Sequence, residues 1–109
     1  MSAYRNRKLL DLAHAIKGCL NCGAYIEHGC DPAHSNSQAH GKGMSIKAHD
    51  VYWAALGNPC GCHKWLDSGI GMDPTGRYTD SREDKQAMWR AAFDRTLLTL
   101  WEQGMVRVA

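Results

Sequence analysis

The stretch Cys60-Gly61-Cys62-His63-Lys64-Trp65-Leu66-Asp67 decides the fold of this chain. It follows a break at Gly57-Asn58-Pro59 and stops at Ser68-Gly69, so it predicts the beginning of a helix bounded by turn residues. His63 and Asp67 are four positions apart, and residues at that spacing lie on one face of a helix. An imidazole and a carboxylate placed in this way can hold one divalent cation such as Mg²⁺, Mn²⁺, Ni²⁺ or Zn²⁺.

A second pair of cysteines stands much earlier, in Cys19-Leu20-Asn21-Cys22-Gly23. Two residues between the cysteines and a glycine after the second are typical of the turn that holds zinc. With Cys60 and Cys62 they offer four thiolates in two pairs, which suits a tetrahedral structural zinc ion that ties the N-terminal helix to the loop before the second helix. The spacing of Cys60 and Cys62 is tighter than usual, so Cys30 is an alternative ligand. The plainer interpretation is that these are buried free thiols.

The composition places the chain among small globular proteins. Its 109 residues allow one domain, and 44% hydrophobic with 22% charged residues exclude wholesale disorder. No apolar run is long enough for a membrane span or for the core of a signal peptide, so we expect a cytoplasmic protein with no membrane partner. Thiols stay reduced in that compartment, and five cysteines is an odd number for a disulfide framework, so both facts favour metal binding.

The N-terminal half contains one predicted helix and a long polar loop. Residues Arg7 to Lys17 carry apolar side chains on one helical face, and Gly18 stops the helix. Residues Ala24 to Ser45 have few apolar side chains and predict a loop, with a short hairpin around Ala24–Asn36. Residues Asp50 to Leu56 are apolar enough for a buried strand or a short helical turn, and periodicity leaves both open.

The C-terminal part contains the clearest element. Gly69 to Thr79 predicts a Gly/Pro linker, and Ser81 then caps a helix that runs to Gly104, with acidic residues in its first turn. A short strand is predicted over Met105–Val108. The helix packs on the core of its own chain or makes a homodimer, and the sequence leaves both open. Its apolar side chains form one stripe and a second row beside it: Trp89, Phe93, Leu97, Leu100 and Trp101, then Met88, Ala92 and Thr96.

Three segments in a fixed order carry a resemblance to a known family. They are Pro32-Ala33-His34-Ser35-Asn36, then His40-Gly41-Lys42-Gly43-Met44-Ser45-Ile46-Lys47-Ala48-His49-Asp50, then the stretch from Cys60 to Asp67. With the Cys19/Cys22 pair before them, they resemble the HNH (ββα-metal) endonucleases, and among these the small YbcO-like nucleases of phages and prophages. The resemblance covers residues 19–67 of the chain.

The resemblance implies an α+β fold: a small zinc-stapled ββα-metal core, an N-terminal helix and a long C-terminal helix, in one domain over residues 1–109. In that fold a β-hairpin carries the first His and the following helix carries the last, and both face one metal ion. Carried over, His34 is the general base that activates water, His63 is a ligand of the catalytic metal and Asp67 is a second helix ligand. Asp50 falls near the central Asn of the motif, which pins the loop and orients the base.

The chain departs from the family pattern in two places. Many HNH enzymes have an Asp or His metal ligand directly before the general base, whereas this chain has Ala33, and Asp31 is one candidate to replace it. The YbcO-like members share that alanine. The spacing of Cys60 and Cys62 is also tighter than the two-residue spacing of the family, which leaves the fourth zinc ligand open.

The resemblance implies DNA as the partner. Lys42 and Lys47 flank the Gly-rich loop and Lys64 follows the helix ligand, so all three can hold backbone phosphates. The net charge of +2 is too small to indicate nucleic acid by itself, and charged side chains are more often simply a solvated face.

Three functions fit these residues. The first is a metal-dependent DNA endonuclease, in phage recombination or DNA processing inside a bacterial host. The second is a zinc-stabilised DNA-binding or adaptor module that kept the shape without cutting, which the missing ligand at Ala33 favours. The third is a zinc-ribbon protein-interaction domain that uses the C-terminal helix as its partner surface.

Overall fold

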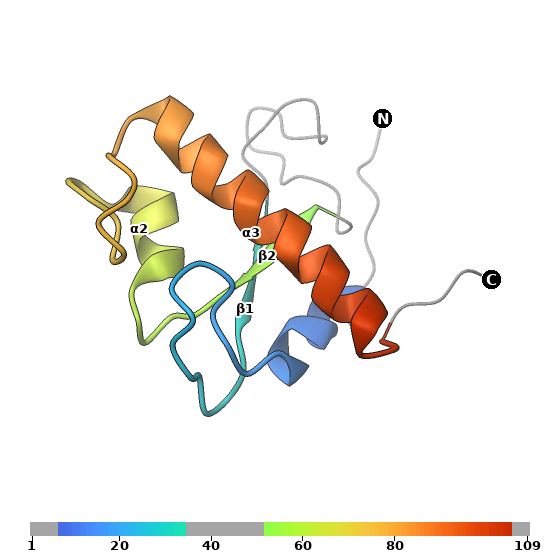
Figure 1. The fold of residues 1–109 in the computed structure, drawn as a ribbon. Coiled ribbons are helices and arrows are strands. Elements are labelled where there is room, and N and C mark those ends of the chain that lie inside the picture. Colours follow the sequence, from blue (N-terminus) through green and yellow to red (C-terminus); the bar gives the residue numbers. More distant parts are fainter. Residues whose placement is uncertain (1–6, 35–51, 106–109) are drawn as a thin grey trace.

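A computed structural model describes residues 7–34 and 52–105 of the chain. The described part is an α+β fold with a two-stranded antiparallel sheet, which confirms the α+β part of the prediction (Figure 1). Helix α3 lies across the sheet and packs against strand β2. No helix in the described ranges is long and apolar enough to cross a membrane. The elements in chain order are α1 (Arg7–Asp11), the 3-10 helix η1 (Leu12–Ala15), β1 (Asp31–His34), β2 (Trp53–Leu56), α2 (Cys62–Ser68) and α3 (Arg82–Glu102).

The N-terminal helix is shorter than its apolar spacing predicts. It changes to a 3-10 helix after Asp11 and ends at Ala15, and Ile16 is already extended with φ −90° and ψ 111°. The backbone beyond it pairs with a later segment instead, because the Ile16 carbonyl accepts from the Cys30 N–H at 2.9 Å and the Lys17 carbonyl accepts from the Ile26 N–H at 2.7 Å. These tertiary hydrogen bonds replace the next helical turn, so the prediction of a helix to Lys17 was wrong.

The sheet joins two segments that are far apart in the sequence. Asp31 pairs with Leu56 and His34 pairs with Trp53, so β1 finds its partner in β2. The predicted hairpin within Ala24–Asn36 was therefore wrong for its described residues, while the segment from Asp50 to Leu56, left open between strand and helix, is a strand over Trp53–Leu56. All of β2 is buried.

The outer edges of both strands are closed by other parts of the chain. On β2, the Ala55 N–H donates to the Thr96 hydroxyl at 3.0 Å, and the Ala55 carbonyl accepts from the Leu20 N–H at 3.0 Å. On β1, the Trp89 indole N–H donates to the Ala33 carbonyl at 2.9 Å. A two-stranded sheet alone is marginal in water, so these contacts stabilise it and fix α3 on top of it.

Helix α3 begins and ends where the sequence predicts. The Ser81 hydroxyl accepts from the Asp84 N–H at 3.1 Å, which is an N-cap bond. At the other end Gly104 has φ +69°, its N–H donates to the Trp101 carbonyl, and the Met105 N–H donates to the Leu100 carbonyl. This is the Schellman arrangement, which requires a left-handed residue at the position of Gly104. The strand expected over Met105–Val108 lies almost wholly outside the described residues.

The buried face of α3 is rotated from the predicted stripe. Leu97 and Trp101 of that stripe are 40% and 50% exposed, so the stripe as a whole is not the buried face of the helix. The face is centred on the neighbouring row because the Thr96 hydroxyl must reach the Ala55 N–H. Trp89 is buried and stacks on the half-buried Phe93 at 4.8 Å between ring centroids, so neither offers the exposed surface expected of a partner-binding helix. The buried residues of α3 are Met88, Trp89, Ala92, Thr96 and Leu100.

Candidate functional site

Four cysteine side chains meet at one point, as the sequence predicts. The Sγ atoms of Cys19, Cys22, Cys60 and Cys62 all lie within 4.8 Å of one another. Tetrahedral zinc with bonds of about 2.3 Å needs sulfur atoms about 3.8 Å apart, so sub-ångström adjustments complete the geometry. All four thiols are free of disulfides. The cluster can therefore hold a metal ion, and its soft sulfur donors select an ion such as zinc.

Two glycines with positive φ make this convergence possible. Gly23, at φ +80°, follows the first pair, and its N–H closes the turn on the Cys19 carbonyl at 2.8 Å. Gly61, at φ +87°, stands between Cys60 and Cys62. A left-handed residue at that position reverses the chain within one residue, which lets both thiols face the same point despite their short spacing. The tight spacing is thus compatible with a four-cysteine site.

Cys30 lies outside the cluster. Its Sγ is fully buried and donates to the Gly18 carbonyl at 3.4 Å. Burial, reinforced by the charge of the neighbouring Cys19, raises the pKa of the Cys30 thiol to about 12, so it remains protonated. Its role is to pack the core, and the alternative in which it replaces a ligand is not the arrangement found.

Hydrogen bonds distribute the protons among the clustered thiols. A hydrogen bond from Cys62 lowers the pKa of Cys19 to about 4, despite burial, and raises that of Cys62 itself. Burial raises the pKa of Cys60 to about 11. These interactions stabilise the thiolate of Cys19 and keep protons on Cys60 and Cys62, and a cation must displace those protons when it binds.

Asn21 and Asp73 form a second layer around the cluster. The Asn21 side-chain amide donates to Cys62 Sγ at 3.3 Å and to Asp73 Oδ2 at 2.9 Å. Asp73 is only 4% exposed and also accepts from the backbone N–H groups of Arg77 and Tyr78. Burial raises the pKa of this carboxyl, but the hydrogen bonds, led by that from Asn21, outweigh burial and hold the pKa at about 2. Outer hydrogen bonds of this kind orient metal ligands.

Sequence reasoning missed Asp73, because the segment from Gly69 to Thr79 was interpreted as a linker. The signal that could have found it is Asp73-Pro74-Thr75-Gly76, with the residue types of a tight turn in their preferred order. The structure contains that turn, since the Gly76 N–H donates to the Asp73 carbonyl at 2.9 Å. The segment is a hydrogen-bonded loop that contacts the turn between Cys19 and Cys22 through Asn21.

The predicted ligands of the catalytic cation, His63 and Asp67, both lie on α2, and His63 also contacts Asp31 of β1. His63 Nε2 is 3.3 Å from Asp67 Oδ2, and His63 Nδ1 is 3.5 Å from Asp31 Oδ2. The strand residue Asp31, considered as a replacement for the ligand missing at Ala33, thus reaches the helix imidazole. The two carboxylates contact opposite ring nitrogens, so they do not converge on one point as the thiols do.

The remaining predicted residues are partly described. His34 ends β1, is half-buried and stands opposite Trp53 in the strand register. Lys64 is exposed on α2, next to His63. Asp50, Lys42 and Lys47 lie outside the described residues, so their predicted roles stay predictions.

The comparisons with known proteins give no match to a family model, to a curated protein or to a solved structure.

Proposed function

We propose that this chain is a zinc-stapled, metal-dependent DNA endonuclease of the HNH type. The observation that carries the proposal is the contact between Asp31 of β1 and His63 of α2. It supplies a carboxylate from the strand beside the helix imidazole. That carboxylate can replace the metal ligand that HNH enzymes have at the position of Ala33. The same strand ends at His34, the residue proposed as the general base.

The proposal gives each residue a role. Zinc on the four cysteines is structural and holds the first pair of cysteines to the start of α2. His63, with Asp67 and Asp31, holds the second cation, which when bound stabilises the charge that develops on the phosphate and on the leaving 3′-oxygen. His34 takes the proton from the attacking water. The Lys64 side chain holds the phosphate.

The carboxylates must turn to share one cation with His63. Asp67 is 58% exposed and Asp31 36%, so both side chains have room to change rotamer. His63 is only 24% exposed and is fixed on its helix. We therefore expect the side-chain rotamers of Asp31 and Asp67 to change when a cation binds, while the His63 ring keeps its position.

A second function is favoured by one specific observation. Both nitrogens of His63 have a carboxylate partner, at 3.5 Å and 3.3 Å, on opposite sides of the ring. His63 would then be a structural link between β1 and α2, and the protein a zinc-stabilised DNA-binding or adaptor module that does not cut.

The test is cleavage of supercoiled plasmid by the wild type, His34→Ala and His63→Ala, with Mg²⁺, Mn²⁺ or Ni²⁺ added, or with EDTA. The control is Gln86→Ala, which removes an exposed polar side chain on α3. The wild type and the control should cut only with added cation. Loss of the general base should slow cutting by at least about 100-fold, with the zinc content unchanged. A wild type that holds zinc and shifts DNA on a gel, but cuts with none of these cations, would establish the binding module instead.

A further inference from the structure

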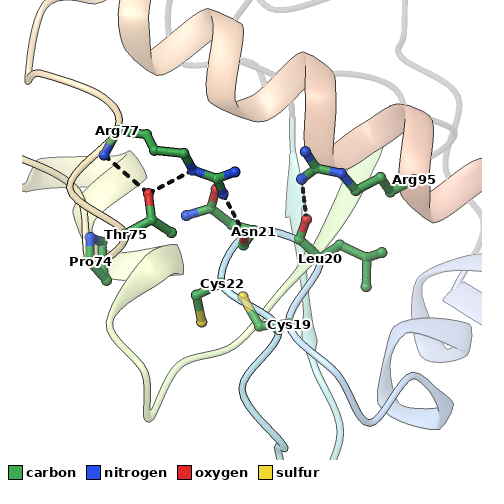
Figure 2. A pocket seen from close by; sticks show the side chains of 9 residues that line it. Cys19, Leu20, Asn21, Cys22, Pro74, Thr75, Arg77 and Arg95 are labelled. Atoms are coloured by element: carbon green, nitrogen blue, oxygen red, sulfur yellow. Dashed lines mark hydrogen bonds between the residues drawn. The ribbon is translucent and has the colours of Figure 1, made fainter.

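Two arginines, Arg77 and Arg95, approach the turn that contains Cys19 and Cys22 from different elements (Figure 2). Arg77 Nη2 donates to the Asn21 carbonyl at 2.9 Å, and Arg95 Nη1 donates to the Leu20 carbonyl at 2.7 Å. The two carbonyls belong to consecutive residues, so guanidinium groups from a loop and from α3 are brought together over one turn.

Both guanidinium groups keep donors for a ligand. Arg77 uses Nη2 and also Nε, which donates to the Thr75 hydroxyl at 3.1 Å, whereas Arg95 uses Nη1. A guanidinium has five N–H donors, so several remain on each. Within residues 7–34 and 52–105 no carboxylate pairs with either arginine, in contrast to Arg90, which pairs with Asp94 on α3. Neutral carbonyls hold the two groups in place and leave their charge available.

The arginines lie in a strip of surface between this turn and α3, called the seam. It is lined by Lys17, Leu20, Thr75, Arg77 and Arg95. A pocket of about 600 Å³ contains Arg77, Arg95 and Thr75, and a neighbouring pocket of about 450 Å³ shares Leu20 with it and continues to Lys17. No carboxylate lines either pocket. The pocket beside Asp31, by contrast, also contains Glu27. The charged side chains that line the two pockets beside the turn are therefore all cationic.

We infer that this seam binds the phosphodiester backbone of a nucleic acid, with Arg77 and Arg95 donating to phosphate oxygens. Planar guanidinium groups match phosphate oxygens two at a time, and a row of cations without carboxylates fits a repeating anion better than a single neutral ligand. The inference rests on the proposed action on DNA, and adds a contact surface that shares no residue with the His63 site.

The competing explanation is charge compensation within the protein. Zinc with four thiolates carries a net charge of about −2, and Asp73 adds a further negative charge next to it. Two arginines over the turn would offset this charge without binding any ligand. The two explanations differ in what the arginines control, because compensation acts on zinc retention whereas phosphate contact acts on the salt dependence of DNA binding.

The experiment compares Arg77→Gln and Arg95→Gln with the wild type and with the matched control Arg90→Gln. Binding to a short fluorescent DNA duplex is measured by anisotropy over a range of KCl concentrations, without a catalytic cation. Zinc per chain is measured on the same samples. Each seam variant should weaken binding about tenfold at low salt and reduce the slope of log K against log salt by about one, whereas the control should change neither.

Several outcomes would overturn the inference. Seam variants that lose zinc but keep the wild-type salt slope in their zinc-loaded fraction would show that the arginines compensate charge. Seam variants that bind DNA like the wild type would place the contact elsewhere, and leave the proposed nuclease function intact. Absence of DNA binding by the wild type would remove the proposed function as well. Inorganic phosphate that displaces DNA more strongly than KCl of equal ionic strength would indicate a site for a single anion.

Discussion

At the scale of single residues, the cluster depends on groups that are not themselves ligands. Gly61 supplies the left-handed backbone between two cysteines, and Asn21 connects Cys62 Sγ to the buried Asp73 carboxylate. Neither residue offers a metal ligand. Gly61 instead turns the chain so that the thiols can face the same point, and Asn21 donates hydrogen bonds to a buried sulfur and to a buried carboxylate.

Gly61→Ala should weaken zinc binding. The site has room for a methyl group, with Pro74 Cγ the nearest atom at 3.8 Å, so the cost comes from the positive φ and amounts to about 1–2 kcal/mol. Because relaxation of this strain would move Cys60 and Cys62 apart, we expect zinc affinity to fall roughly tenfold or more, measured by competition with a chromogenic chelator. Gly104→Ala is the control, since it has a similar strain with open space around it, far along the sequence from the cysteines. Equal losses of zinc affinity in both variants would contradict the prediction.

Asp73→Asn should remove a stabilisation that depends on pH. The pKa of Asp73 is about 2 in the folded protein, below the ordinary value of 3.8, so the carboxylate stabilises the fold above pH 3.8 and loses this contribution as the pH falls towards 2. The shift corresponds to about 2 kcal/mol at neutral pH. Urea unfolding of both proteins between pH 7 and pH 3 gives the difference at each pH, and the zinc content measured on each sample separates loss of zinc from loss of the charge. A constant difference over this range would contradict the prediction.

At the scale of elements, the short sheet is completed by side chains of α3. Thr96 binds the outer edge of β2, where a third strand would otherwise pair. Its hydroxyl accepts from the Ala55 N–H and donates to the Ala92 carbonyl at 2.8 Å. On β1, the Trp89 indole N–H donates to the Ala33 carbonyl at the outer edge of the strand. The position of His34 and Asp31 relative to α2 therefore depends on a helix far away in the sequence.

Thr96→Val should lower the free energy of unfolding by about 1–3 kcal/mol, because the shape is kept while the buried Ala55 N–H loses its acceptor. Thr96→Ser keeps the hydroxyl and should recover most of the loss. Thr99→Val on the same helix is a control for the substitution itself, since Thr99 is only partly buried. Chemical denaturation of the zinc-loaded proteins measures all three. A Thr96→Val protein as stable as the wild type would show that the Ala55 N–H finds another partner.

At the scale of the whole molecule, a metal at the cluster would join segments that otherwise share a small core. The cysteines come from the turn after η1 and from the start of α2, and the loop around Asp73 is tied to the same turn through Asn21 and Arg77. A chain of about 110 residues buries only roughly two thirds of the surface of its unfolded form, so a cross-link of this kind weighs heavily in its stability.

Removal of the metal should unfold the N-terminal segment and α2. We expect a strong chelator to reduce the far-ultraviolet circular dichroism and to lower the midpoint of thermal unfolding, with recovery on addition of Zn²⁺, because metal-binding energy is folding energy in small metal-dependent domains. Cys22→Ala should behave like the chelated protein. Cys30→Ala removes a buried thiol outside the cluster and should keep one zinc per chain. Identical unfolding with and without chelator would show that the cluster contributes no stability.

The sequence determined the local chemistry of this protein, and the tertiary structure decided how distant segments meet. Cysteine spacing, the Ser81 cap, the Gly104 stop and the His63–Asp67 spacing are all properties of short segments, so they could be predicted. The partner of β1, the early end of the first helix, the rotation of α3 towards Thr96 and the placement of Asp31 beside His63 could not, because each depends on contacts with residues far along the chain. Local propensity is weak where a buried N–H or carboxylate must find its partner, and there the packing of the whole chain decides.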